Sequence, residues 1–314
     1  MPPEIVCVVG PTASGKTKMG VAIAKAFGGE VVSVDSMQIY RGMTVGTAAP
    51  TADEMEGIPH HMIAVADPAE SWSVARFTEE ADACIQDILR RGKLPVLVGG
   101  TGLYLDALVR GNSFAEGHAG GEIRAALQQR LETEGAAVLL QELRTIDPEA
   151  AEKLHLKDEK RILRALEVWQ ETGKTITQHN LETQAVPDKY KAVYIGLDFE
   201  NRDDLRARID RRVDIMVEQG LLQEVEALLS SGISATATAL QAIGYKQFLA
   251  VQQGTATVEE AVEEVKLRSR QYAKRQLTWL RRNEKIHWIR WEKVPDFQAA
   301  LQKATEIITA EGLS

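Results

Sequence analysis

The sequence predicts an α/β protein in which a helical insertion interrupts a parallel-sheet core, and three observations lead to this prediction. Short apolar runs alternate with helical stretches along the 314 residues, as in the βαβ units that build parallel sheets. A glycine-rich loop follows the first apolar run directly. A long middle stretch has helical spacing and contains no convincing strand.

Four apolar runs are the predicted strands of the core: residues 4–9, 31–34, 94–98 and 191–199. Between them, residues 73–91 have the spacing of a helix that stops at Gly92. Ligands of open parallel sheets bind beyond the carboxyl ends of the strands. We therefore expect the glycine loop, Asp35 after the second run and Thr101 after the third run to lie along one edge of the sheet.

The same pattern divides the chain into three segments. Residues 1–110 are predicted to form the first part of the core, residues 111–189 the helical insertion, and residues 190–314 the second part of the core. Residues 111–121 of the insertion are expected to be a loop, and residues 122–172 to be helical.

The composition is that of an ordinary globular protein, with 44% hydrophobic and 26% charged residues. No apolar run approaches 18 residues, so a membrane span is not expected. The N-terminal residues lack the pattern of a secretion signal. Cys7 and Cys84 lie in apolar patterns that indicate neither a metal cluster nor a disulfide framework, and we expect a cytoplasmic protein.

The net charge of −8 conceals an uneven distribution. Between Lys266 and Arg290 the sequence has nine Lys or Arg and one acid, Glu284, which gives this segment a net charge of about +8. Thr257 and Glu260 have the spacing of a capping box and are predicted to begin a long helix that runs into this segment. A basic helix suits a nucleic-acid partner, although the overall charge argues against one.

The loop GPTASGKT, from Gly10 to Thr17, matches the phosphate-binding pattern G-x-x-x-x-G-K-[ST]. Its glycines allow backbone N–H groups to converge on phosphate oxygens. The predicted diphosphate contacts are Gly10, Thr12, Ala13, Ser14, Gly15, Lys16 and Thr17, with the Thr17 hydroxyl as a ligand of Mg²⁺. Most proteins with such a loop bind ATP or GTP, and the pattern does not say what happens to the phosphate.

An acid for proton transfer or metal binding is missing from its usual place. The third run ends in VGGTG without a carboxylate, whereas a nucleotide hydrolase has an acid after such a strand. Asp35 follows the second run instead. A carboxylate beside a phosphate loop can accept a proton from a nucleophile, but Asp before Ser also commonly stabilises a turn, and the pattern leaves both roles open.

Eight stretches, taken in order, resemble the tRNA dimethylallyltransferases, also called tRNA isopentenyltransferases. They are GPTASGKT (10–17), DSMQIYRGM (35–43), GTAAP (46–50), VGGTGLY (98–104), RILRALEVWQETGK (161–174), LRARIDRRVDIMVEQGLLQEV (205–225), QAIGYKQ (241–247) and RQYAKRQLTWLRR (270–282). The resemblance extends over nearly the whole chain. One departure is Ala49, where the family pattern has a lysine whose charge alanine cannot supply.

The resemblance implies transfer of a dimethylallyl group from dimethylallyl diphosphate to N6 of the adenosine 3′ to the anticodon of tRNA, with Mg²⁺ as cofactor and pyrophosphate as leaving group. It makes Asp35 and Thr101 the catalytic residues. Asp35 would take the amine proton, and Thr101 would bind metal, phosphate or the target base. Arg208 and Arg212 share one face of a predicted helix and are candidates to clamp the diphosphate; pairing with Asp204 or Asp210 is the alternative.

A base in an anticodon loop must be flipped out to enter such a site, which requires contacts to the surrounding RNA. The predicted tRNA contacts are Asp35, Ser36, Met37, Gln38, Thr101, Arg161, Gln241, Gly244, Lys246, Arg275 and Arg282. Tyr272 and Trp279 of the basic helix are expected to pack mostly in the core. The anticodon stem-loop is the expected partner of a monomer, with no obligate protein partner. His60 and His61 have no partner at metal-ligand spacing, and we assign them no metal.

Three rival functions are compatible with parts of the sequence. A small-molecule P-loop kinase would use the loop and Asp35, but it leaves the basic helix and the insertion unexplained. A prenyltransferase that acts on free adenine nucleotides needs no contacts to an anticodon. A nucleotide-switched RNA-binding protein would bind ATP or GTP tightly and leave the RNA unchanged.

Overall fold

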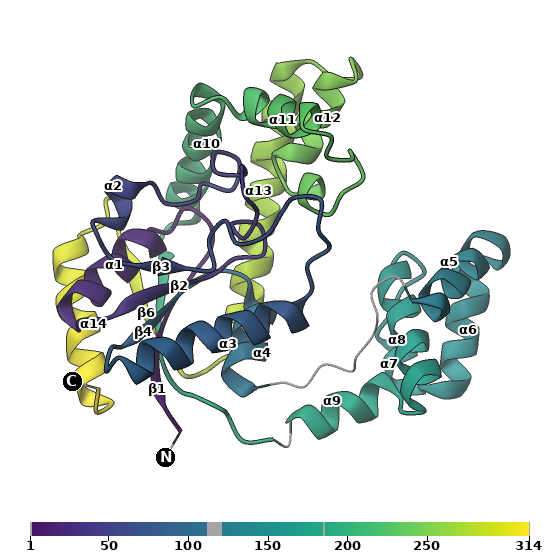
Figure 1. Cartoon of the computed structure of the whole chain (residues 1–314), viewed down its shortest axis with the longest axis horizontal. Helices are drawn as coiled ribbons and strands as arrows, with labels where there is room; N and C mark the ends of the chain where they lie inside the picture. The colour runs from purple at the N-terminus through teal and green to yellow at the C-terminus, as the bar shows by residue number, and fades with distance from the viewer. Residues whose placement is uncertain (1, 112–120, 185, 314) are drawn as a thin grey trace. The chain divides into compact units, whose positions relative to one another are not determined.

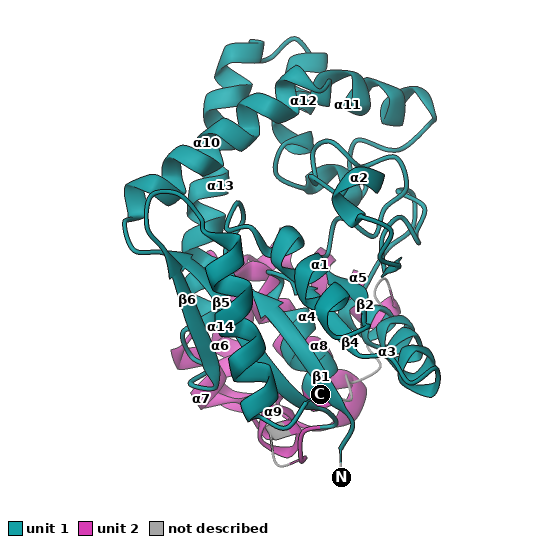
Figure 2. Cartoon of the chain, turned by 90° about the vertical axis from the view of Figure 1, so that its left-hand side faces the viewer, with its two compact units in different colours: residues 1–109, 189–314 teal, residues 110–188 magenta. Residues whose placement is uncertain are grey.

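The computed structural model describes residues 2–111, 121–184 and 186–313 (Figure 1). It divides into two compact units, one made of residues 1–109 and 189–314 and the other of residues 110–188 (Figure 2). The limits predicted from the sequence, 111 and 189, are adjacent to these. Most of the predicted loop at 111–121, namely residues 112–120, lies outside the described residues.

The larger unit is built on a parallel sheet, which confirms the predicted α/β class. The strands, in the spatial order β3-β2-β4-β1-β5-β6, have the following bounds: β1 Glu4–Val9, β2 Glu30–Val34, β3 His60–His61, β4 Pro95–Gly99, β5 Lys191–Phe199 and β6 Ile286–Trp291. Every pair of neighbouring strands is parallel. β1 therefore lies inside the sheet, between β4 and β5.

The sequence pattern does not predict β3 and β6. β3 has two residues, too few to show any period. β6 begins at Ile286, shortly after the basic helix ends at Leu280, and its charged residues resemble a continuation of the basic segment. Its buried residues are Ile286 in one apolar cluster and Ile289 and Trp291 in the cluster on the other face, and exposed His287 and Arg290 interrupt them, so the strand has no regular alternation.

Helices cover both faces of this sheet. Their bounds are α1 Lys16–Ala26, α2 Ala52–Met55, α3 Val74–Arg90, α4 Gly102–Arg110, α10 Arg202–Glu218, α11 Leu221–Ser230, the 3₁₀ turn η1 Ala239–Gln241, α12 Tyr245–Gln252, α13 Val258–Leu280 and α14 Phe297–Ala310. β1 contributes Ile5, Cys7 and Val9 to one apolar cluster, and Val6 and Val8 to the cluster on the other face. None of the described helices is long and apolar enough to cross a membrane.

The predicted start of the basic helix α13 is confirmed. The side chain of Thr257 accepts a hydrogen bond from the Glu260 N–H (3.2 Å), and the Glu260 carboxylate accepts one from the Thr257 N–H (2.9 Å). This capping box satisfies backbone donors at the first turn of the helix.

The smaller unit is helical throughout its described residues, which confirms the helical insertion. Its helices are α5 Glu122–Glu134, α6 Ala136–Ile146, α7 Pro148–Glu152, α8 Glu159–Thr172 and α9 Ile176–Gln184. Leu127, Leu139, Leu143, Ile162 and Leu166 are fully buried in a core of its own. Arg161, on α8, has a 74% exposed side chain.

A buried carboxylate ties β2 to the segments on either side of it. The Glu30 side chain is 2% exposed and accepts hydrogen bonds from Arg91 Nη2 (2.7 Å), Lys93 Nζ (2.7 Å) and His61 Nε2 (2.8 Å). Hydrogen bonds from Arg91 lower the pKa of Glu30 well below its usual range.

We expect Glu30→Gln to lower the free energy of unfolding at pH 7 by about 2–3 kcal/mol, because it removes the charge of a buried carboxylate that accepts hydrogen bonds from Arg91, Lys93 and His61. Since the pKa of Glu30 is lowered in the folded state, the wild type has this stabilisation above about pH 4.3, the unfolded value, and loses it as the pH falls. Urea unfolding at several pH values measures the difference. Glu79→Gln, at an exposed position of α3, is the control and should change the midpoint little.

Candidate active site

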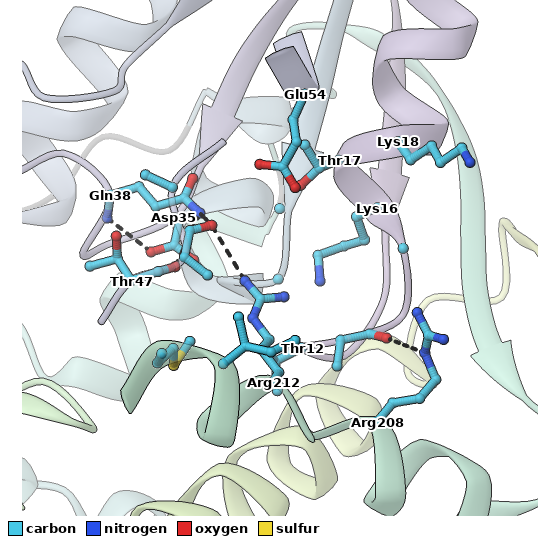
Figure 3. A pocket seen from close by; sticks show the side chains of 18 of the residues that line it. Thr12, Lys16, Thr17, Lys18, Asp35, Gln38, Thr47, Glu54, Arg208 and Arg212 are labelled. Atoms are coloured by element: carbon cyan, nitrogen blue, oxygen red, sulfur yellow. Dashed lines mark hydrogen bonds between the residues drawn. The ribbon is translucent and has the colours of Figure 1, made fainter. Parts of the chain in front are cut away.

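The loops that follow β1, β2 and β4 meet at one edge of the sheet. Gly99, the last residue of β4, is paired with Val9 on one side and with Val34 on the other. A cavity of about 1070 Å³ opens at this edge (Figure 3). Nine of the predicted site residues line it: Thr12, Ala13, Gly15, Lys16, Thr17, Asp35, Gln38, Arg208 and Arg212.

The conformation of the glycine loop requires its glycines. A Cβ atom at Gly10 would lie 2.4 Å from the carbonyl oxygen of Leu197, and Gly15, at φ +91°, would place one 2.8 Å from the Phe297 ring. Both contacts are shorter than real Cβ atoms allow, so no other residue fits at either position. Gly10 and Ser14 are buried and do not line the cavity, so any contact they make to a ligand is through the backbone.

Side chains from the second part of the core hold the backbone of this loop. The bonds run from the Thr12 N–H to Gln276 Oε1 (2.9 Å), from Arg208 Nε to the Ala13 carbonyl (3.3 Å) and from Trp291 Nε1 to the Ser14 carbonyl (2.8 Å). Gln276 also donates to the carbonyl of Gly100 (3.0 Å), and thus links the loop after β1 to the loop after β4. Of these three residues, Arg208 is a predicted diphosphate contact, whereas no site role is predicted from the sequence for Gln276 or Trp291.

The amine of Lys16 lies in the loop and donates to the carbonyl of Pro11 (2.7 Å). Burial and the nearby charge of Arg212 lower the pKa of Lys16 to about 7, against the opposing effect of Asp35. A bound polyphosphate would supply the negative charge that the buried ammonium needs. The site is thus suited to an anion.

Arg208 and Arg212 enter the same cavity from α10. Arg212 Nη2 donates to the carbonyl of Ala48 (3.4 Å), and burial lowers its pKa (Figure 3). Within the described residues, neither arginine forms an ion pair with Asp204 or Asp210, and Asp210 pairs with Arg270 instead (2.5 Å). The surface pairing is therefore not formed among the described residues, and the clamp stays a prediction.

Asp35 stabilises a turn, which is one of the two roles that the sequence left open, and it also lines the cavity. Its Oδ1 accepts hydrogen bonds from the N–H groups of Met37 (2.8 Å) and Gln38 (3.2 Å). Both bonds use the same oxygen, and Oδ2 takes part in none of the hydrogen bonds that the described residues form. The two roles left open by the sequence are therefore compatible in one side chain.

Thr101 supports this turn from the loop that follows β4, and it does not itself line the cavity. Its Oγ1 accepts a hydrogen bond from the Ser36 N–H (3.3 Å). Tyr272, expected in the core, is instead a half-buried part of the cavity wall and is hydrogen-bonded to Thr101. Burial and the charge of Asp35 raise the pKa of Tyr272 to about 12, so its hydroxyl stays protonated at neutral pH.

The glycines of VGGTG allow helix α13 to approach the sheet. A Cβ atom at Gly100 would lie 2.1 Å from Gln276 Nε2, and one at Gly102 would lie 2.2 Å from the Trp279 ring. Trp279 donates from Nε1 to Asp106 (2.8 Å), which fixes the helix at this contact. The second glycine motif thus serves packing, whereas the first one shapes the phosphate loop.

Gln38 is held in a single orientation beside Asp35. Its Oε1 accepts from Ser33 Oγ (3.0 Å), and its Nε2 donates to the carbonyls of Thr47 (3.4 Å) and Ala48 (3.3 Å). Ser36 and Met37, in the same turn, do not line the cavity.

The remaining predicted tRNA contacts lie outside the cavity lining, and their roles stay predictions. Gln241 ends the 3₁₀ turn η1, Gly244 precedes α12, and exposed Lys246 lies in its first turn. Arg275 and Arg282 cover the rings of Tyr272 and Trp279, with 5.7 and 5.4 Å between guanidinium carbon and ring centre.

The other lining residues have no site role predicted from the sequence, although several of them lie in the stretches that resemble the family. They include Lys18, Thr44, Val45, Thr47, Ala48, Ala49, Glu54, Val98, Ile215, Met216, Tyr272, Gln276 and Phe297. Lys18, one residue beyond the loop pattern, lies over the Phe297 ring at 4.5 Å. Thr17 and Glu54 provide a hydroxyl and a carboxylate to the cavity, and oxygen donors of these kinds suit Mg²⁺ (Figure 3).

The sheet and its glycine loop define a P-loop protein, and comparisons with known proteins narrow the class. The profile of the IPP transferase family matches residues 38–283, and that of the isopentenyl transferases matches residues 3–65. A tRNA dimethylallyltransferase from Caldanaerobacter subterraneus subsp. tengcongensis is 46% identical over 286 residues, which is 91% of each chain. Its counterpart from Halalkalibacterium halodurans is 44% identical over 99% of this chain and 98% of its own.

Two solved structures are similar over almost the whole chain. The tRNA isopentenylpyrophosphate transferase of Bacillus halodurans has a TM-score of 0.74 at 42% identity, with coverage of 98% of this chain and 96% of that one. A eukaryotic dimethylallyltransferase, described as acting on tRNA, has a TM-score of 0.83 at 30% identity, with coverage of 99% and 81%. The chain belongs to the tRNA dimethylallyltransferase family, as the sequence motifs indicate.

We expect diphosphate binding above pH 7 to take up a proton at Lys16. Because the pKa of Lys16 is about 7 before binding, the amine is mostly neutral at pH 8, and a bound anion favours its protonated form. Calorimetric titration with inorganic pyrophosphate in buffers of different ionisation enthalpy should show uptake of up to about one proton at pH 8. In Lys16→Met the uptake at the amine is absent, and only changes in the protonation of pyrophosphate itself remain. Equal proton uptake by the wild type and Lys16→Met would contradict the assignment of the proton to Lys16.

Proposed function

We propose that this protein transfers the dimethylallyl group of dimethylallyl diphosphate to N6 of the adenosine 3′ to the anticodon of tRNA, and releases pyrophosphate. The observation that carries the proposal is the shared cavity: it joins a phosphate loop, two arginines and the carboxylate of Asp35 in a chain of this family. The names of the relatives support the class of reaction.

The donor diphosphate would lie on the glycine loop. The backbone N–H groups of the loop, the ammonium of Lys16 and the guanidinium groups of Arg208 and Arg212 would contact its oxygens. Mg²⁺ would be held by the Thr17 hydroxyl together with diphosphate oxygens, and would supply further positive charge to the leaving group. A site of this kind stabilises departing pyrophosphate without hydrolysing it.

The acceptor adenine would enter beside Asp35. As the N6–carbon bond forms, the allylic carbon–oxygen bond breaks and pyrophosphate leaves with its electron pair. The proton of the amine passes to Oδ2 of Asp35, the oxygen that the turn does not use. The amine is a weak nucleophile, so its orientation by Asp35 and by the fixed amide of Gln38 contributes to the rate.

The proposal is tested with purified protein, Mg²⁺, dimethylallyl diphosphate and an unmodified anticodon stem-loop that has adenosines 3′ to the anticodon. Mass spectrometry should detect one added prenyl unit in the RNA. Asp35→Asn keeps an oxygen to accept from Met37 and Gln38 but cannot take a proton, so kcat should fall by about 10²–10⁴-fold.

Asp53→Asn, at an exposed position of α2, is the matched control and should retain wild-type kcat. Free AMP and the stem-loop are compared as acceptors, and ATP consumption is measured in parallel. Consumption of ATP without prenylation would favour the kinase, and prenylation of AMP alone would favour the nucleotide prenyltransferase. Wild-type kcat in Asp35→Asn would refute the role of Asp35 as the base.

A further inference from the structure

A single carboxylate on α11 binds the whole backbone of the loop at residues 44–46. Glu224 Oε2 accepts hydrogen bonds from the N–H (2.8 Å) and the hydroxyl (3.1 Å) of Thr44 and from the N–H of Val45 (2.8 Å). Its Oε1 accepts from the N–H of Gly46 (2.9 Å) and from the hydroxyl of Tyr245. Three consecutive backbone donors thus depend on one side chain.

This arrangement fixes the conformation of the loop. Hydrogen bonds to an ionised acceptor are stronger than those between neutral groups, and a loop whose N–H groups converge on one carboxylate cannot change shape without losing several at once. Tyr245 is fully buried, and a Cβ atom at Gly46 would lie 2.5 Å from its ring. The loop is therefore held between α11 and α12.

The next residues of the same loop contact two predicted active-site side chains. The carbonyls of Thr47 and Ala48 accept from Gln38 Nε2, at 3.4 and 3.3 Å. The carbonyl of Ala48 also accepts from Arg212 Nη2 (3.4 Å). Thr44, Val45, Thr47 and Ala48 all line the cavity. The shape of the loop thus determines where Gln38 and Arg212 lie.

We propose that Glu224 is a positioning residue for prenyl transfer, acting through the loop at 44–48 on Gln38 and Arg212. The proposal rests on the function proposed above. The carbonyl groups of Thr47 and Ala48 accept from Gln38, and that of Ala48 also accepts from Arg212, so the loop acts on the cavity through its carbonyl groups. Glu224 holds those carbonyl groups in place without contacting the cavity itself.

The test compares Glu224→Gln with Glu226→Gln, an equal change on the same helix at an exposed residue that bonds Gln252. A glutamine side chain has one acceptor oxygen, so it cannot accept both from the donors that bond Oε1 of Glu224 and from those that bond Oε2. We expect amide hydrogen exchange of a peptide covering residues 43–48 to rise about tenfold or more in Glu224→Gln and not in Glu226→Gln. The kcat for prenyl transfer should fall by up to about 100-fold, because small displacements of orienting groups have effects of this size.

A graded variant separates positioning from a loss of folding. Tyr245→Phe removes one of the five hydrogen bonds and should give a smaller change in exchange and in kcat, in the same direction. All variants are assayed below their unfolding midpoints, together with the Kd for inorganic pyrophosphate. A role confined to stability would lower the midpoint but leave the kcat of the folded molecules and the Kd at wild-type values, which would overturn the proposal.

The failure of this proposal is distinguishable from failure of the proposed function. If the wild type does not prenylate the stem-loop, the proposed function is wrong. In that case, amide hydrogen exchange and the Kd for inorganic pyrophosphate still test whether Glu224 positions Arg212. If the wild type is active and Glu224→Gln matches Glu226→Gln in exchange, kcat and Kd, Glu224 has no positioning role.

Discussion

The hydrogen bonds of Gln276 are the interaction on which the active-site edge of this protein depends. A single buried amide accepts from the phosphate loop at Thr12 and donates to the loop after β4 at Gly100. Arg208 and Trp291 hold the next two carbonyls of the phosphate loop. The loop is local in sequence, but its position is determined by three elements that follow the insertion.

Close packing allows these contacts to form. Helix α13 lies near enough to bring Gln276 to Gly100 only because this glycine and Gly102 have no Cβ atoms to obstruct it. The same helix places Tyr272 against Thr101, which supports the turn around Asp35. A basic helix whose charges suggest contact with RNA is thus also the structural support of the cavity.

The sequence predicted what local patterns encode. The glycine loop, the turn at Asp35 and the capping box of α13 each depend on residues a few positions apart, and the main strands show as apolar runs. The side chains that hold these parts together were not predictable in this way. Glu224 contacts residues 44–46 and Gln276 contacts Thr12 across most of the chain, so no period or spacing reveals them. Strand β6 was missed because it has no regular alternation and follows shortly after a long basic helix.

The placement of β1 has a consequence for synthesis of the protein. β1 pairs with β5, and Glu4 of β1 lies opposite Lys191 of β5. The phosphate loop follows β1 and is held by residues as late in the chain as Trp291. A nascent chain that emerges from the ribosome with its first half complete therefore has a central strand without one neighbour and a phosphate loop without its supports. Ligand affinity must appear late in translation, when nearly the whole polypeptide has been made.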